Sequence, residues 1–181
     1  MKQLRFLLLM FFISNRIFAQ LDFKYDNVLY PTIYPEDLYK FIETHPDVVL
    51  VDVRSPGEFA DTSRFGSLNI GHLKGAVNVP VDSILKNTDC LKKYEDKTIL
   101  LYCSHSQRSR LSSKTLAEKG FKKVYNLNGG MSSMNQSTPK DFPHKKELIV
   151  SSLPYRNCSV TEVVRLLDKD KNVLVIDVRP T

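Results

Sequence analysis

Tryptophan is absent from the 181-residue chain, and cysteine and glycine are scarce, with three and seven residues. So few cysteines exclude a disulfide-dense scaffold, and the low glycine and proline content excludes collagen-like and low-complexity chains. The cysteines show no CxxC spacing and the histidines no HxxxH spacing, so we expect neither a metal site nor a cofactor. Apolar residues make up 42% of the chain, which is enough for a packed core at this length.

Long charged and long apolar runs are also missing. Lysine and arginine never occur more than two in a row, so nucleic-acid binding is not expected despite the formal charge of +6. The apolar run from Phe6 to Ile13 has eight residues, whereas a bilayer-spanning helix needs about 20. A basic start, this run and a small residue, Ala19, give residues 1–19 the pattern of a secretory signal peptide. We therefore expect an exported protein, periplasmic or extracellular, without stable membrane insertion after cleavage; its oligomeric state is left open.

The sequence contains an internal repeat. Residues 35–54 align without a gap to residues 160–179, at a constant offset of 125. Each copy has apolar residues at helical spacing and then a continuous apolar run, 48–53 or 173–178, which is typical of a strand buried in a parallel sheet. The repeat predicts one complete module at residues 31–136, a linker at 137–146, and the incomplete start of a second module at 147–181.

Strands and helices are expected to alternate in the first module. The predicted strands are 48–53, 76–79, 98–102 and 123–127, and the predicted helices are 35–45, pieces between 82 and 94, and 109–119. This order indicates an α/β fold with a parallel central sheet flanked by helices on both faces. The long loop 54–75 is expected to border the functional site.

The candidate site is the segment CSHSQRS, which starts at Cys103. It follows an apolar strand and precedes a helix, and sites in parallel sheets form where helix N-termini present unpaired amides. The helix dipole and Arg108 both favour the nucleophilic thiolate. Cys103 is thus the candidate catalytic residue, and the amides around it would bind the substrate: Ser104, His105, Ser106, Gln107, Arg108 and Ser109.

Five segments together resemble the rhodanese-like sulfurtransferases. They are Val51–Arg54, Glu58–Phe59, Gly71–Pro80, Cys103–Arg108 and Gly129–Gly130. The resemblance implies a rhodanese-like fold and an enzyme that moves a sulfane sulfur. In such an enzyme Cys103 would take sulfur from a donor such as thiosulfate, hold it as a persulfide, and pass it to a thiol or cyanide acceptor. The second copy of the repeat resembles the opening of another such module.

The resemblance also suggests supporting residues. Arg54 and Glu58 resemble the family's structural ion pair. Asp52 is a candidate orienting group whose expected role is to cap loop amides. His105 could tune the thiolate, but it is expected to face the solvent. His72 is expected to be a hydrogen-bonded turn residue. Arg108 either binds an anionic donor or braces the loop against a carboxylate.

Three departures and two alternatives accompany this interpretation. Ser106 stands where the family often has glycine, residues 60–70 form an insertion, and no tryptophan follows Gly130.

A phosphatase or arsenate reductase on the same fold would place the loop arginine one residue further on, which enlarges the loop for a tetrahedral oxyanion. The present spacing therefore favours a sulfur atom, which is smaller than that oxyanion. A non-catalytic rhodanese-like binding module is the other alternative, against which Cys103 argues.

Overall fold

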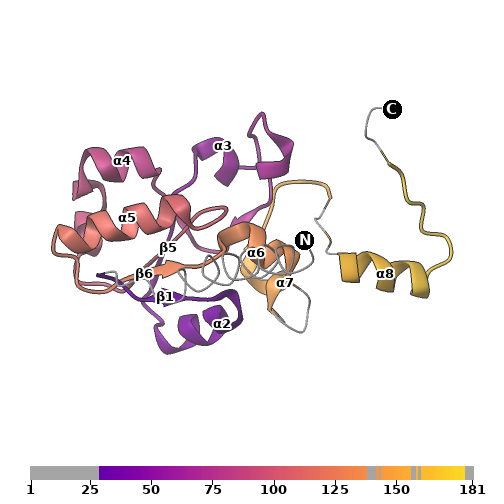
Figure 1. The fold of residues 1–181 in the computed structure, drawn as a ribbon, viewed down its shortest axis with the longest axis horizontal. Helices are drawn as coiled ribbons and strands as arrows, with labels where there is room; N and C mark the ends of the chain where they lie inside the picture. Colours follow the sequence, from indigo (N-terminus) through magenta and orange to yellow (C-terminus); the bar gives the residue numbers. More distant parts are fainter. Residues whose placement is uncertain (1–28, 138–141, 143, 156–157, 159, 178–181) are drawn as a thin grey trace, which may run out of the picture.

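The computed structural model describes residues 29–137, 142, 144–155, 158 and 160–177; the predicted signal peptide, residues 1–19, lies outside them. At the centre lies a five-stranded sheet with every pair parallel, in the order β1-β6-β5-β2-β4 (Figure 1). The strands are β1 (Thr32–Ile33), β2 (Val49–Asp52), β4 (Val77–Asn78), β5 (Ile99–Tyr102) and β6 (Val124–Leu127). The predicted α/β fold with a parallel sheet is confirmed.

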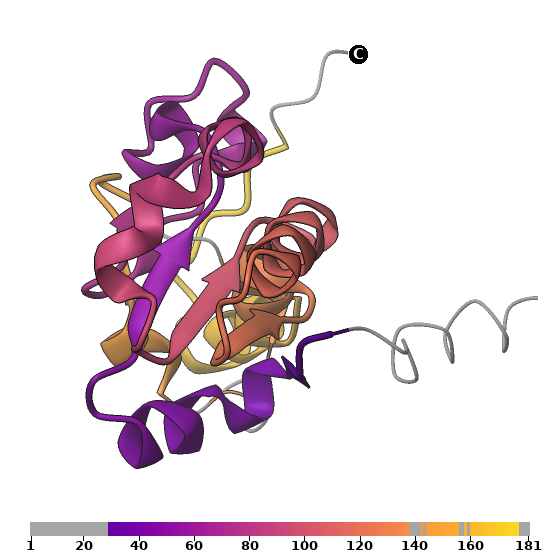
Figure 2. The same ribbon diagram turned by 90° about the vertical axis from the view of Figure 1, so that its left-hand side faces the viewer.

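Helices cover both faces of the sheet (Figure 2). One face packs against α4 (Val81–Lys86), the 3-10 helix η2 (Thr88–Tyr94) and α5 (Gln107–Glu118), and the other packs against α2 (Pro35–Thr44) and α6 (Gly130–Gln136). Side chains of β5 alternate between the two layers: Ile99 and Leu101 lie in the α5 core, whereas Leu100 and Tyr102 lie in the α2 core. All four are buried, as the continuous apolar run predicts.

The predicted loop 54–75 contains short elements that the sequence analysis missed. They are α3 (Pro56–Phe59), the 3-10 helix η1 (Gly66–Leu68) and β3 (His72–Leu73). Helix α3 begins with a capping box, in which Ser55 and Glu58 bond each other's backbone amides, and Pro56 occupies the first turn. This signature was readable in the sequence, but a helix of one turn leaves no periodicity to detect.

Residues after α6 return to the first domain. Phe142 is buried in the α2 core, and after α7 (Lys145–Leu148) the strand β7 (Ile149–Val150) pairs antiparallel with β3. The carboxylate of Asp61 accepts hydrogen bonds from the Ser151 hydroxyl and the Ser152 amide, at 2.6 and 3.0 Å. These residues pack on the first domain, although the sequence analysis placed them in a linker and a second module.

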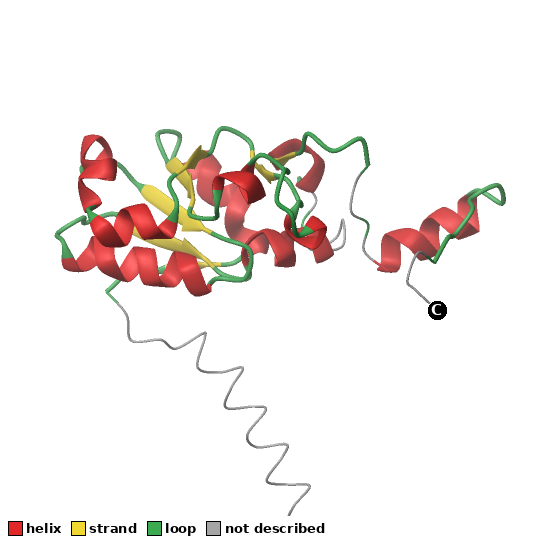
Figure 3. Ribbon diagram, turned by 90° about the horizontal axis from the view of Figure 1, so that it is seen from above, coloured by secondary structure: helices red, strands yellow, loops and turns green. Residues whose placement is uncertain are grey.

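The last described element is α8 (Val160–Lys169), which lies at one end of the molecule, away from the sheet (Figure 3). The predicted helix of the second copy is present, but the predicted strand 173–178 is wrong for its described residues, 173–177. Val175 and Ile176 are 65% and 67% exposed. A strand needs a neighbour to pair its amides and carbonyls, and the described residues offer none here. Among the described helices, none combines the length and apolarity that a bilayer crossing requires.

Candidate functional site

Cys103 follows β5 directly and lies beneath the loop that leads into α5. Its side chain is 1% exposed, and its Sγ atom lies 3.7 Å from Ser109 Oγ. The Cys103 carbonyl accepts the Met131 amide at 2.9 Å. Gly130 has a φ of +52°, and a Cβ atom there would lie 2.0 Å from the Cys103 carbonyl oxygen. The start of α6 can therefore close against the cysteine only because residue 130 is glycine.

Ser106 takes the conformation that glycine would have in this loop. Its φ of +81° is left-handed, which is uncommon for a residue with a Cβ atom. The Ser106 hydroxyl donates to Asn128 Oδ1 at 3.0 Å and accepts the Gly129 amide at 2.5 Å. These two bonds hold the strained residue in place, so the loop keeps a left-handed turn without glycine.

The predicted substrate-binding residues divide into two sets. The side chains of Ser104, Ser106 and Ser109 are buried around Cys103, whereas those of His105 and Gln107 are exposed. The exposure of His105 agrees with a solvent-facing histidine rather than one that lies against the sulfur. For the exposed residues, a contribution to binding would come from their backbone amides.

Arg108 joins the loop to α3. Its two terminal nitrogens donate to both oxygens of Glu58 at 2.6 and 2.7 Å, and one also donates to Ser104 Oγ at 2.9 Å. Glu58 is 3% exposed. Burial raises the pKa of Glu58, but hydrogen bonds from Arg108 and Ser55 outweigh it and hold that pKa at about 2. Arg108 thus braces the loop against a carboxylate, one of its two predicted roles, and donor binding stays a prediction.

The same guanidinium lies within electrostatic reach of the sulfur. The pKa of Arg108 is raised chiefly by its hydrogen bonds to Glu58, and Cys103 adds a smaller contribution in the same direction. Arg108 is therefore charged at every physiological pH, and the Glu58 carboxylate fixes its orientation. An anion bound above Cys103 would meet a positive charge that is already in place.

The predicted ion pair between Arg54 and Glu58 is wrong. Arg54 instead pairs with Asp52 at 2.7 Å, with both side chains fully buried, and Glu58 is occupied by Arg108. Arg54 also donates to the Gly71 carbonyl at 2.7 Å. Asp52 Oδ1 accepts the Arg54 amide at 2.9 Å, so the predicted capping role of Asp52 is confirmed. This pair anchors the connection after β2 to the segment before β3.

His72 is hydrogen-bonded, as predicted, but it lies in strand β3 and not in a turn. Its Nδ1 lies 2.9 Å from the Phe59 carbonyl oxygen, and its ring stacks on the Phe59 ring with centroids 4.0 Å apart. His72 thereby fastens β3 to the end of α3, one residue after Glu58. Its contacts support the loop that carries the carboxylate, and none of them involves Cys103.

Two asparagines at this site were missed by the sequence analysis. Asn126 lies on β6 and is fully buried, with its Oδ1 2.7 Å from Ser109 Oγ, and Asn128 holds Ser106. The signal for them was the segment Val124–Asn128, in which amide side chains interrupt an otherwise buried apolar strand. A polar residue at a strand position that should be apolar needs a partner, and here the partners belong to the cysteine loop.

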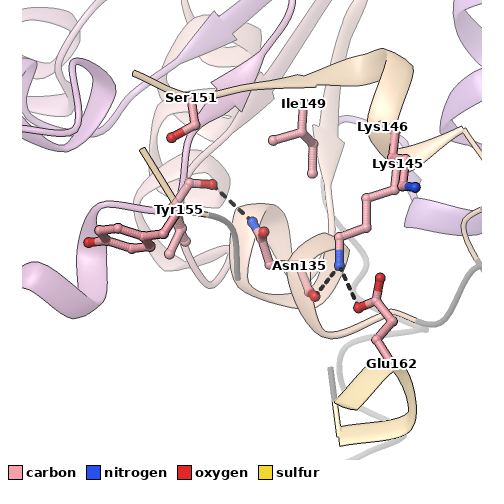
Figure 4. Close-up of a pocket in the computed structure, with 8 residues that line it drawn as sticks. Asn135, Lys145, Lys146, Ile149, Ser151, Tyr155 and Glu162 are labelled. Atoms are coloured by element: carbon pink, nitrogen blue, oxygen red, sulfur yellow. Dashed lines mark hydrogen bonds and ion pairs between the residues drawn. The ribbon is translucent and has the colours of Figure 1, made fainter. Parts of the chain in front are cut away.

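A pocket of about 460 Å³ lies elsewhere, between the domain and α8 (Figure 4). The Lys145 ammonium donates to the Asn135 carbonyl and lies 3.6 Å from a Glu162 oxygen. The residues that line the pocket are Ile70, Asn135, Lys145, Lys146, Ile149, Ser151, Tyr155 and Glu162. None belongs to the Cys103 loop, so this pocket is a contact region of α8 and not the cysteine site.

The part of the chain that the structure describes contains neither a cluster of metal-ligating side chains nor a disulfide bond. No three histidine, cysteine or carboxylate side chains converge there as metal ligands. Cys90, Cys103 and Cys158 are free, and only Cys103 among them is buried.

Comparisons with known proteins agree with this architecture. The Rhodanese-like domain family matches residues 34–137, more than half of the chain. The chain is 29% identical over 124 residues to the uncharacterized protein YqhL of Bacillus subtilis, covering 68% of this chain and 87% of that protein. It is also 28% identical over 131 residues to the tRNA uridine(34) hydroxylase of Hamiltonella defensa, covering 65% of this chain but only 34% of that protein.

Among solved structures, a rhodanese-related protein of Thermoplasma volcanium matches with 25% identity and a TM-score of 0.45, covering 57% of this chain and 89% of that one. The parallel sheet, the strand-to-helix loop that starts with Cys103 and the match over residues 34–137 lead to one conclusion. The chain belongs to the rhodanese-like domain family.

Proposed function

We propose that this protein is a sulfurtransferase that carries a sulfane sulfur as a persulfide on Cys103. The observation that carries the proposal is the placement of a buried thiol at the base of the loop that leads into α5, beside Arg108 held by Glu58. Helix N-termini and guanidinium groups both stabilise anions, and the working form of a cysteine nucleophile is its anion.

In the first step the Cys103 thiolate attacks the outer sulfur of thiosulfate. A new S–S bond forms to Cys103, the S–S bond of thiosulfate breaks, and its electron pair leaves with sulfite. The products are a cysteine persulfide anion and sulfite, so charge and atoms balance. Arg108 would attract the anionic donor, and the loop amides would surround the outer sulfur. Because Cys103 is 1% exposed, a small inorganic donor fits this site better than a bulky one.

In the second step a thiolate or cyanide acceptor attacks the outer sulfur of the persulfide. The acceptor gains the sulfur, the S–S bond to Cys103 breaks, and the electron pair returns to Sγ as the resting thiolate. No external oxidant or reductant is consumed.

The experiment is a thiosulfate:cyanide assay on the purified protein and four variants. Cys103→Ser should abolish thiocyanate formation, whereas Cys90→Ser, a change at an exposed free cysteine, should leave the rate at the wild-type value. Arg108→Lys keeps the charge but loses the two-point contact with Glu58, so it should raise the KM for thiosulfate without eliminating turnover. Lys114→Arg, a change at an exposed residue further along the same helix, serves as its control and should leave the KM unchanged.

The outcomes separate the three activity classes. Hydrolysis of an aryl phosphate that depends on Cys103, without thiocyanate formation, would favour the phosphatase alternative. Neither activity in a folded protein would favour a binding module.

We also propose a tandem organisation, in which the second module predicted at residues 147–181 is narrowed to the second copy of the repeat, residues 160–179, because β7 pairs with β3 of the first domain. In the repeat, Val175 and Ile176 correspond to Leu50 and Val51, which are 8% and 0% exposed in the first module. The same pattern therefore has a buried copy and an exposed copy, and within the described part of the chain no layers cover the exposed copy as they cover β2. Export through the signal sequence at residues 1–19 is the accompanying proposal for the location of the protein.

A further inference from the structure

A buried hydroxyl and a buried amide lie behind the sulfur of Cys103. Ser109 and Asn126 are both fully buried. The Ser109 Oγ atom lies 2.7 Å from Asn126 Oδ1, 3.0 Å from the Ser106 carbonyl oxygen and 3.7 Å from Cys103 Sγ. A hydroxyl has one proton, so Ser109 can donate fully to only one of these three acceptors at a time.

The amide of Asn126 is only partly used in this arrangement. Its Nδ2 atom is buried and has no hydrogen-bond acceptor among the described residues. A buried donor without a partner is destabilising, and such groups in native proteins call for an explanation. Half a turn about the side chain's last bond exchanges Oδ1 and Nδ2. That turn would place an N–H group against Ser109 Oγ and free the Ser109 proton for another acceptor.

We propose that Ser109 donates its proton to the Cys103 sulfur when that sulfur is a thiolate, and that Asn126 positions Ser109 by donating to its oxygen. The inference rests on the proposed function, because it assigns a role at the sulfur that would carry the persulfide. A charged acceptor forms a stronger hydrogen bond than a neutral carbonyl, so charge on the sulfur selects this orientation of the amide. With a neutral thiol, Ser109 donates to Asn126 Oδ1 instead.

The same hydrogen bond serves the second half of sulfur transfer. When the acceptor removes the outer sulfur, the electron pair of the broken S–S bond arrives on Cys103 Sγ. Ser109 lies close enough to stabilise that charge from the buried side, while the loop amides and Arg108 would act on the outer sulfur.

The effect of the neutral residues Ser109 and Asn126 on thiolate formation can be separated from the effect of the charged groups around the site. Arg108 approaches the sulfur from α5, Glu58 from α3 neutralises part of its charge, and the buried pair of Asp52 and Arg54 ends the neighbouring strand β2. Ser109 and Asn126 carry no charge, so their effect on thiolate formation should be insensitive to salt, whereas the effect of Arg108 should weaken as salt rises.

The test is a pH titration of thiolate ultraviolet absorbance in a Cys90→Ser, Cys158→Ser background, which leaves Cys103 as the one cysteine in the chain. Asn126→Ala and Ser109→Ala should each raise the midpoint of thiolate formation by about one pH unit, which is about tenfold less thiolate at a given pH. Asn126→Asp, which keeps the shape but offers no neutral amide donor, should raise it at least as far. Ser113→Ala is the matched control, because Ser113 is a buried serine one turn further along α5 whose Oγ has no partner among the described residues.

A folded Asn126→Ala variant with the wild-type midpoint would overturn the positioning role, and so would an equal shift in Ser113→Ala. If the Asn126 variants fail to fold, Ser109→Ala provides the test, because it removes only one oxygen atom. A Ser109→Ala variant with the wild-type midpoint of thiolate formation would overturn the inference. Thiosulfate uptake by the same proteins separates the two proposals. Shifted midpoints without uptake in the wild type would refute the proposed function alone, whereas uptake with unmoved midpoints would refute this inference alone.

Discussion

Arg108 and Glu58, fifty residues apart in the chain, form a two-point ion pair with nitrogen–oxygen distances of 2.6 and 2.7 Å. The pair ties the cysteine loop at the start of α5 to the one-turn helix α3. Because Glu58 also closes the capping box of α3, one carboxylate fixes both the local fold of α3 and the orientation of the loop arginine.

This pair predicts a specific dependence of stability on pH. The folded-state pKa of Glu58 is held at about 2, below its unfolded value of about 4.3. The contribution of the carboxylate is therefore complete above about pH 4.3 and is lost as the pH falls towards 2. Glu58→Gln should lower the free energy of unfolding at pH 7 by about 2 kcal/mol, less than for a fully buried pair because Arg108 is partly exposed.

Urea unfolding at neutral and acidic pH measures this effect. The difference between wild type and Glu58→Gln should shrink as the pH is lowered through that window. Glu95→Gln is the control, since Glu95 forms an exposed surface pair with Lys92. A difference for Glu58→Gln that stays constant down to pH 2.5 (about two units below the unfolded pKa) would contradict the assignment.

Ser106 allows backbone strain and side-chain bonding to be separated. Ser106→Ala keeps the left-handed strain and loses both hydrogen bonds, so it should cost about 2 kcal/mol of stability. Ser106→Gly loses the same bonds but relieves the strain, so it should cost about 1 kcal/mol less than the alanine variant. Denaturant midpoints check the order; an alanine variant as stable as the glycine variant would show that φ at this position carries no strain.

The repeat predicts unequal protection along the chain. Amides of residues 160–177 should exchange with deuterium far faster than those of β5, whereas residues 145–152 should be protected with the first domain because β7 pairs with β3. Exchange of peptides from the full chain, followed by mass spectrometry, measures both. Protection of residues 173–177 equal to that of β2 would contradict the finding that no described strand pairs with this segment.

Export predicts processing of the N-terminus. Protein recovered from the envelope or medium should begin at or near Gln20, as read by N-terminal sequencing. Leu8→Arg with Leu9→Arg, which breaks the apolar run, should leave the precursor uncleaved, whereas Lys92→Arg should not affect processing. Intact Met1 on the wild-type protein would refute the signal peptide.

The fold could be predicted from the sequence because a strand that is buried on both faces requires a nearly continuous run of apolar residues, and such runs can be recognised in the chain. The run that became β5 is apolar throughout, and the run that became β2 is apolar up to Asp52, as is typical of strands in a covered parallel sheet. The position of Cys103 followed in the same way, from the junction between a buried strand and a helix.

Pairings between distant residues could not be read from the sequence. The sequence analysis paired Arg54 with Glu58, and only the structure shows that Arg54 pairs with Asp52 while Glu58 pairs with Arg108. The incorrect prediction of a strand at 173–177 has a related cause. An apolar run indicates that a segment could form a buried strand, but it does not indicate whether a neighbouring strand is present to pair with it.

The proposed persulfide on Cys103 is tested most directly by the mass of the protein after exposure to thiosulfate and removal of excess donor. We expect a gain of one sulfur atom, located on the peptide that contains Cys103, and its loss on addition of a thiol or cyanide. Cys90→Ser should gain the same mass and Cys103→Ser none. A persulfide found on another cysteine, or an unchanged mass for folded wild-type protein, would contradict the claim that Cys103 carries the sulfur.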